Sequence, residues 1–231
     1  MNMKRFFLNY LVIVVLAATA LFTACNKDKD GKGGGKITMT TKSDVVIIIM
    51  AGSGTVSINW GDGSKIETHT LQAPDYKYGV WYSSDDYFHV HEYPSASSRR
   101  ITITGEDITY LDCSRNQLTE LDVSKNSALI ILGCNDNKLT RLDMSGLTSL
   151  RSFGCSVNQL ASLDMSDCTA LEKGFSCYSN LLTTSALNAL FYSLPPPVQS
   201  GSVIVIYDNP GAYDCNRRIA ENKGWRVDYM D

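Results

Sequence analysis

The stretch from Ile108 to Leu182 decides the fold, because four of its segments repeat one pattern. They read YLDCSRNQLTELDVSKNSAL (110–129), ILGCNDNKLTRLDMSGLTSL (131–150), SFGCSVNQLASLDMSDCTAL (152–171) and FSCYSNLLT (175–183). Each has a cysteine, an asparagine three residues later and a leucine two residues after that. The cysteines recur after 21, 21 and 22 residues: Cys113, Cys134, Cys155 and Cys177. Repetition at such a period indicates a solenoid.

The repeats predict a core that is shared between turns. In the first turn Ile108, Leu111 and Cys113 alternate along a short strand and face inward. Their equivalents stack above them: Leu129, Leu132 and Cys134; Leu150, Phe153 and Cys155; Leu171, Phe175 and Cys177. One turn cannot bury its own apolar edge, so stacking makes the core continuous. We expect each asparagine to turn its amide inward and hydrogen-bond to buried loop backbone groups.

The pattern resembles the L-x-x-L-x-L-x-x-N-x-L motif of leucine-rich-repeat proteins, with cysteine in the last apolar position. The resemblance covers about a third of the chain. It implies parallel strands on one face, turns on the other and little helix. The predicted fold class is mainly β, with a short solenoid over residues 105–184. A small β-sandwich-like domain precedes the solenoid, and an α/β C-terminal cap closes it.

Residues 1–24 read as a secretory signal peptide. A basic start at Lys4 and Arg5 precedes an apolar run that is short for a transmembrane anchor. The ending Phe-Thr-Ala-Cys resembles a bacterial lipobox, which implies that Cys25 becomes the lipidated N-terminus of the mature chain. A secreted protein without lipid is the alternative.

Residues 25–36 are charged and glycine-rich, which predicts a flexible tether. The run from Lys27 to Asp30 resembles the export signals of surface lipoproteins in Bacteroidota. The chain is therefore expected in the cell envelope, as an outer-membrane lipoprotein exposed at the surface. A solvated linker without an export function is the alternative.

Residues 37–104 predict a small antiparallel β domain. Residues 45–50 suit a strand buried on both faces, and residues 56–60 alternate as a half-buried strand. The Trp60-Gly61-Asp62-Gly63 turn resembles the hairpin of PKD-type immunoglobulin-like domains, and His91-Glu92-Tyr93 with residues 100–104 resembles that family's last hairpin. Alternatively, the segment is an N-terminal cap whose last strand leads straight into the first repeat.

Residues 185–231 lack the repeat pattern and predict the C-terminal cap. A helix is expected over 185–194 with Ser185 as its N-cap, followed by an all-apolar strand at 203–207. A second short helix at 214–222 and a strand at 225–227 complete the block. It resembles the C-terminal ends of Bacteroidota leucine-rich-repeat lipoproteins, and solenoids need such caps to stay soluble.

The cysteines other than Cys25 are even in number, which in an exported protein suggests disulfides. The four repeat cysteines instead replace an apolar residue, and their parallel Cβ vectors suit disulfide geometry poorly. We expect them to be buried free thiols. A zinc site is disfavoured because no histidine joins their spacing. Cys168 and Cys215 cannot be paired from sequence.

Other candidate chemistry is sparse. His89 and His91 alternate on one strand face and could begin a metal site, but the sequence places no third ligand. Asp122, Asp143 and Asp164 recur with the repeat and could bind calcium. Serines two residues after each aspartate favour local Asp-x-Ser turns instead. No nucleophile–base pair or phosphate loop is present in the sequence, so we expect no catalysis, cofactor or metal.

Two surfaces are candidates for binding. The first is the concave sheet face of the repeats, where repeat proteins commonly bind partners. Its expected contacts are Tyr110, Asp112, Ser114, Ile131, Asn135, Asp136, Ser156 and Tyr178. The second is an aromatic segment that could stack on sugar rings through Tyr76, Tyr78, Trp81 and Tyr82. These aromatic residues could equally cover the open end of the small domain.

The composition is that of a globular protein, with 44% apolar residues and a net charge of −3 that shows no nucleic-acid footprint. We predict a non-enzymatic, lipid-anchored envelope protein that is monomeric and mediates protein interaction or adhesion through its repeats. The alternative is a glycan-binding accessory lipoprotein. A hydrolase ranks last, because the sequence places no converging acids.

Overall fold

The computed structural model describes residues 35–74, 76–77, 80–81 and 87–230. They form β1 (Gly35–Thr41), β2 (Val45–Asn59), β3 (Glu67–Thr70), β4 (Tyr76–Lys77), β5 (Val80–Trp81), β6 (Phe88–Glu92), β7 (Arg99–Asp112), β8 (Leu118–Asp122), β9 (Ile131–Gly133), β10 (Ser152–Gly154), β11 (Gly174–Ser176), α2 (Thr184–Ser193), β12 (Val203–Val205), α3 (Arg218–Glu221) and β13 (Arg226–Asp228). Within these ranges, neither helix has the length and apolar character needed to cross a bilayer.

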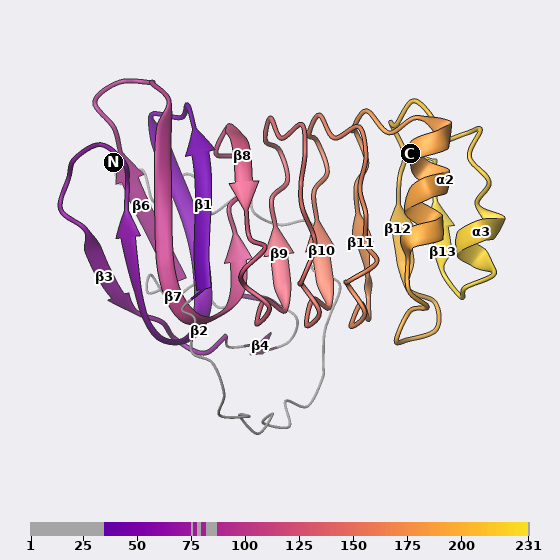
Figure 1. Ribbon diagram of the computed structural model, residues 1–231, viewed down its shortest axis with the longest axis horizontal. Coiled ribbons are helices and arrows are strands. Elements are labelled where there is room, and N and C mark those ends of the chain that lie inside the picture. The colour runs from indigo at the N-terminus through magenta and orange to yellow at the C-terminus, as the bar shows by residue number, and fades with distance from the viewer. Residues whose placement is uncertain (1–34, 75, 78–79, 82–86, 231) are drawn as a thin grey trace.

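The repeats stack as parallel strands in register. Leu132 of β9 lies beside Phe153 of β10, which lies beside Phe175 of β11. The sheet then continues through Ile204 of β12 and Val227 of β13. These inward residues are buried in one core that extends over the whole described chain. Figure 1 shows the strands following one another along the long axis of the molecule, with α2 and α3 at the C-terminal end.

The repeat asparagines tie each turn to its neighbours, as the sequence predicted. The Nδ2 group of Asn137 donates to the carbonyl oxygens of Cys113 and Cys134 at 3.1 Å each and of Asn135 at 3.2 Å. Its Oδ1 accepts from the backbone N–H groups of Asn116 and Leu118. Asn158 and Asn180 also donate to the cysteine carbonyls of their own and the preceding turn. We call this series the asparagine ladder.

The ladder extends beyond the predicted repeats at both ends. At the N-terminal end, the amide of Asn116 donates to the carbonyl of Ile47 at 2.7 Å and accepts from its N–H at 2.9 Å, which joins β2 to the first turn. At the C-terminal end, Asn209 donates to Cys177 and Ile206 and accepts from Leu182. The C-terminal block therefore contains a fifth copy of the turn, which the sequence prediction missed.

The N-terminal strands share the sheet and core of the repeats. Strand β7 is continuous across residues 104 and 105, pairing antiparallel with β1 and β2 and parallel with β9. Strand β1 also pairs with β8 of the first turn. This continuity agrees with the alternative that residues 37–104 lead directly into the repeats as a cap.

The two strands predicted at 45–50 and 56–60 are one strand, β2, so their separation was wrong. Register shifts at Ala51/Gly52 and Ser53/Val56 let β2 bend while it stays paired with β7. The backbone at Gly52 approaches β7 so closely that a Cβ there would overlap the carbonyl of Asp107. Glycine at this position lets one strand bend where the sequence suggested two.

The C-terminal elements differ from the predicted ones at their ends. Helix α2 starts one residue earlier than predicted, because Thr183 rather than Ser185 is its N-cap and accepts from the N–H of Ala186. The helix predicted at 214–222 is reduced to α3, since turns occupy the preceding residues. Lys223 donates to the carbonyls of Tyr192 and Leu194, which satisfies the C-terminal end of α2.

The same left-handed backbone turn precedes the asparagine in every copy. The φ angles are 61° at Arg115, 53° at Asp136, 56° at Val157, 51° at Ser179 and 55° at Asp208. A β-branched residue is strained in this conformation, because its Cβ substituents crowd the adjacent carbonyl. Val157 is therefore the least suited of the five.

Replacing Asn137 by alanine removes the donors and the acceptor that join two successive turns, and leaves buried backbone groups unpaired. We expect the free energy of unfolding to fall by about 3–4 kcal/mol. Chemical denaturation measures this loss. Asn222→Ala is the matched control, because Asn222 is exposed, and its effect should stay within about 0.5 kcal/mol. Equal losses in the two variants would contradict the role of the ladder.

Replacing Val157 by asparagine should raise the free energy of unfolding by about 1 kcal/mol, since asparagine tolerates the left-handed region. Val157 is 40% exposed, so little packing is lost. The control is Val198→Asn, at a valine that is 57% exposed and has no positive φ. A gain at Val198 as large as at Val157 would show that backbone strain is not the cause.

Candidate functional site

The candidate site is the solvent side of the parallel strands from the end of β7 through β9 to β13, which we call the parallel-sheet face. The buried core residues of each strand alternate with the residues that form this face, so every second side chain of a strand points to the solvent side. It contains all the predicted concave-face residues except Asp136, which lies in the adjoining turn. The structure shows which of them are covered, which are hydrogen-bonded within the face and which remain accessible.

The N-terminal end of the parallel-sheet face is covered. Tyr110 is 7% exposed and packs with Ala51 and Tyr87 in a small apolar cluster. Phe88 and Ile131 are partly buried against the same cluster. The sequence analysis assigned Tyr110 and Ile131 to this face, but it gave no sign that residues near the start of β6 would cover them.

A polar row runs across the first three turns and is bonded within itself. Asp112 accepts from the N–H of Ser114 at 2.9 Å, and Ser114 Oγ accepts from the N–H of Asn135 at 3.0 Å. Asn135 Oδ1 in turn accepts from the N–H of Ser156 at 2.9 Å. Burial raises the pKa of Asp112 against the opposing effect of its bond to Ser114. These predicted ligand contacts therefore also hold the turns in register.

Two glycines leave room for this row. A Cβ on Gly133 would lie 2.9 Å from Asp112 Oδ1, and one on Gly154 would lie 2.9 Å from the side-chain nitrogen and oxygen of Asn135. The side chains of Asp112 and Asn135 therefore lean across the neighbouring strand. Ser156 is fully buried, and its Oγ has no hydrogen-bond partner within the part of the chain that the structure describes.

The C-terminal half of the parallel-sheet face is aromatic and aliphatic. Tyr178 stacks on Tyr207, with ring centroids 4.4 Å apart and an interplanar angle of 19°. Val203 and Val205 lie on the same side of β12, half-buried, beside the exposed Arg226 and Asp228 of β13. Of these residues only Tyr178 was predicted. The missed signal is Ile206-Tyr207-Asp208-Asn209, which aligns with Cys177-Tyr178-Ser179-Asn180.

The remaining predicted site residues lie at the edge of this face or outside it. Asp136, in the turn, forms an exposed ion pair with Arg115 at 3.5 Å. Strands β4 and β5 pair the backbones of Tyr76 and Trp81. Tyr78, Tyr82 and the predicted lipidation site Cys25 lie outside the described residues.

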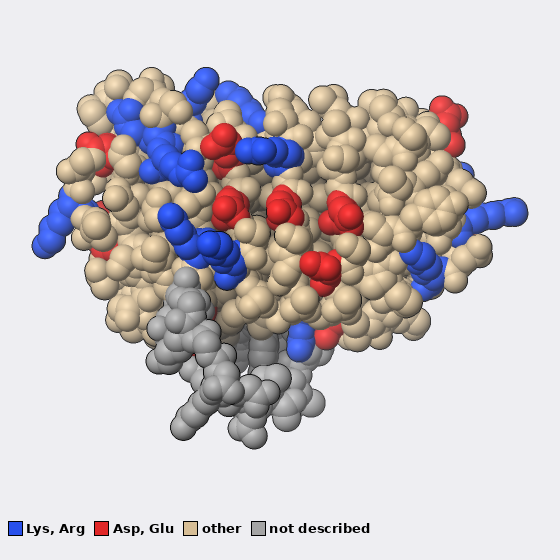
Figure 2. Space-filling model, in the orientation of Figure 1, with Lys and Arg blue, Asp and Glu red and all other residues tan. Residues whose placement is uncertain are grey.

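The recurring aspartates lie on the opposite wall, where the structure confirms the preferred Asp-x-Ser turns. The N–H groups of Ser124, Ser145 and Ser166 donate to Asp122, Asp143 and Asp164. These bonds hold the pKa of Asp143 and Asp164 below its usual value. Figure 2 shows acidic side chains in a row along the repeats, with basic side chains gathered toward the N-terminal end.

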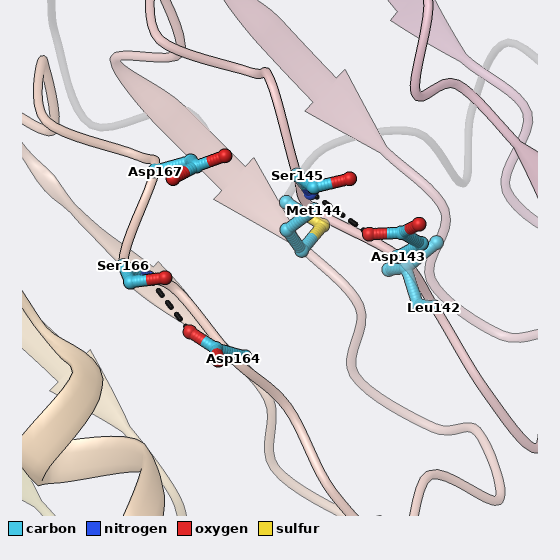
Figure 3. Close-up of a pocket in the computed structure, with 7 residues that line it drawn as sticks. All are labelled: Leu142, Asp143, Met144, Ser145, Asp164, Ser166 and Asp167. Carbon is cyan, nitrogen blue, oxygen red and sulfur yellow. Dashed lines mark hydrogen bonds between the residues drawn. The ribbon is translucent and has the colours of Figure 1, made fainter.

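In a small hollow between two of these turns, the aspartates again bond to the serine of their own turn. It has a volume of about 130 Å³ and is lined by Leu142, Asp143, Met144, Ser145, Asp164, Ser166 and Asp167. Figure 3 shows the carboxylates of Asp143 and Asp164 each turned toward the serine of its own turn. Within the described ranges, no group of three or more histidine, cysteine or acidic side chains is arranged to hold a metal ion.

The two histidines of β6 contact side chains of the N-terminal strands. His91 Nε2 lies 2.8 Å from Asp62 Oδ2, and its ring stacks on Trp60. His89 is 5% exposed and contacts His69, with ring centroids 4.5 Å apart. His89 thus lies in the interior of the N-terminal strands, whereas His91 is only partly buried.

The six described cysteines are free and buried. Burial raises the pKa of the thiols of Cys113, Cys134, Cys155 and Cys177. The thiols of Cys113 and Cys134 lie 3.5 and 3.4 Å from the carbonyl oxygens of Gly133 and Gly154. They fill the interior as small apolar groups, in the position where the fifth copy has Ile206.

Comparison with known proteins found no matching family model, and a comparison with curated proteins found no match. Among solved structures, the chain is similar to the functional domain of InlJ from Listeria monocytogenes, which includes a cysteine ladder. The identity is 28% and the TM-score 0.39. The similarity covers 51% of this chain and 24% of that chain.

The buried thiols give a direct chemical test. In the native protein at pH 8, we expect iodoacetamide to leave Cys113, Cys134, Cys155 and Cys177 unmodified, because only an accessible thiolate reacts. Cys215, at 6% exposed, should react before them. In denaturant all should react, as read by peptide mass spectrometry. Rapid alkylation of any of these four cysteines in the native protein would contradict their burial in the core.

Proposed function

We propose that this protein is a non-enzymatic binding protein whose parallel-sheet face recognises a partner protein. The observation that carries the proposal is the patch of Tyr178, Val203, Val205 and Tyr207, which point out of a sheet held rigid by the asparagine ladder. Apolar side chains on a solvent-facing sheet are a feature of interaction sites. Tyrosine is favoured there, because it offers a large contact area, a polar tip and few rotatable bonds.

The surroundings of the patch support a protein partner. Arg226 and Asp228 are exposed on β13 beside the valines of β12. An apolar centre beside accessible charged groups is the usual arrangement of a protein interface. The polar row of Asp112, Ser114 and Asn135 bonds mainly within itself, so recognition depends on the aromatic and aliphatic side chains.

The proposal places the protein at the cell envelope, in protein interaction or adhesion. What supports this part is the sequence: the signal-like residues 1–24, the lipobox-like ending before Cys25 and the charged residues 25–36. A lipid on Cys25 would hold the repeats near a membrane through this tether.

Glycan binding is the second candidate. Strands β4 and β5 bring the backbones of Tyr76 and Trp81 opposite each other, and the hydroxyl of Tyr87 donates to the carbonyl of Ala73 at 2.8 Å. These contacts order part of the aromatic segment next to the covered end of the parallel-sheet face. A glycan that binds there would leave the repeats as a scaffold.

Photo-cross-linking tests the two candidates in the cells that make the protein. A benzoylphenylalanine residue at position 178 should capture a defined protein, whereas the same residue at position 192 should not. Tyr192 is the matched control, because it is 69% exposed but lies on α2. Equal capture from both positions would contradict a site on the parallel-sheet face.

The captured protein then allows a quantitative test with purified components. Tyr178→Ala should weaken its affinity about tenfold or more, because a buried interface tyrosine often contributes that much. Tyr192→Ala should leave the affinity unchanged. Loss of glycan binding in Trp81→Ala, with no protein bound by the wild type, would favour the second candidate instead.

A further inference from the structure

The three histidines of the chain all lie among the N-terminal strands, on β3 and β6. Two of them have acidic partners: His69 Nε2 lies 3.0 Å from Glu67, and His91 Nε2 lies 2.8 Å from Asp62. His89 is different. It is 5% exposed, and its Nε2 has no hydrogen-bond partner among the residues that the structure describes.

Strand β6, which contains His89, has different neighbours on its two faces. His89 points into the N-terminal interior, where its ring meets the ring of His69 at 4.5 Å. The adjacent Phe88 points the other way, toward the cluster in which Tyr87 packs against Tyr110 and Ile131 of the parallel-sheet face. Within the described ranges β6 pairs only with residues 45–49 of β2. One strand thus connects a buried histidine to the cover of the candidate site.

Few groups around His89 could stabilise a positive charge on its imidazole. Strand β2, which pairs with β6, has no titratable side chain from Val45 to Asn59. Across from it, β3 contributes His69 and Glu67, and that carboxylate is already bonded to His69. A protonated His89 would therefore lose its hydration and face a second imidazole.

We propose that protonation of His89 releases β6 from β2 and uncovers Tyr110 and Ile131, so that acid changes the surface that the parallel-sheet face presents. The release is a property of the fold. Its consequence for binding rests on the proposed function of that face.

The direction of the effect follows from the imidazole. Burial, with a smaller contribution from His69 and against the opposing effect of Glu67, lowers the pKa of His89 from its ordinary 6.5 to about 4. A state in which β6 has opened binds the proton at the ordinary value, so acid favours that state. Closure is fully stable above pH 6.5 and weakens as the pH falls toward 4. Between pH 7 and pH 5 the open population should rise about twentyfold.

Three hydrogen-bonded carboxylates respond to acid in a lower pH range than His89. The pKa of Asp62, Asp143 and Asp164 lies below its usual value, mainly because of hydrogen bonds to serines. Stability that comes from these carboxylates is present at pH 5 and is lost only as the pH falls below about 4. Burial raises the pKa of Asp112, so its protonation in acid stabilises the folded chain and opposes the response of His89. Loss of the acid response in variants of His89 therefore identifies the histidine as its source.

Amide hydrogen exchange of the purified chain at pH 7 and pH 5, corrected for intrinsic rates, tests the proposal without any partner. We expect the protection of residues 88–92 in β6 to fall about twentyfold, while β10 and β11 keep theirs. In His89→Gln and His89→Leu, which cannot take up a proton, β6 protection should no longer depend on pH. His91→Gln is the matched control and should keep the acid response.

Unchanged β6 protection in the wild type would overturn the proposal, and so would an acid response that persists in both His89 variants. Should these variants fold poorly, an NMR titration of His89 in the wild-type protein tests the proposal instead. An imidazole that titrates near 6.5 without increased exchange in β6 also overturns it. Because no partner is used, failure here leaves the cross-linking test of the proposed function unaffected.

Discussion

The structure depends on a buried primary amide that repeats once per turn. An extended chain that folds back on itself every 21 or 22 residues must bury carbonyl and N–H groups at each corner. Asparagine satisfies several of them at once, because its amide has two donors and an acceptor with two lone pairs. Asn137 uses all of them, on residues of two successive turns. A single turn lacks most of these partners, so the turns stabilise one another only as a stack.

The same amide chemistry attaches the N-terminal strands. Asn116 has no earlier turn to bond to, and it takes both backbone groups of Ile47 in β2 instead. On the other side, Asn126 donates to the carbonyl of Lys36 in β1. Strands β1 and β2 therefore occupy the place of a preceding turn at the end of the solenoid. A terminal turn without such partners would expose its backbone groups and the apolar edge of the core.

The sequence predicted the repeats and their asparagines because both are local and periodic. It missed the fifth copy because α2 is inserted before it, so Asn209 follows Asn180 by 29 residues. The pairing of β1 with both β7 and β8 was also out of reach. Alternation shows which side chains of a strand face inward, but not which distant strand lies beside it. The bend of β2 was hidden because a glycine pair between two apolar runs is equally compatible with a turn.

In the candidate site, the alternation of residues along a strand predicts which side of the sheet a residue faces, but not whether it is exposed to solvent. Alternation along the strands led to the predicted face residues, but Tyr110 and Ser156 among them are buried. Whether a residue on that side meets solvent depends on side chains from other segments, and Tyr87 and Phe88 come from outside the repeats. Hydrogen bonds within the face then occupy Asp112, Ser114 and Asn135. What remains for recognition is the half of the face farthest from the N-terminal strands, where Tyr178 and Tyr207 stack and β12 turns its valines outward. Its strand, apolar on both sides, was predicted as part of the C-terminal cap, yet one of its sides faces outward with the rest of the sheet.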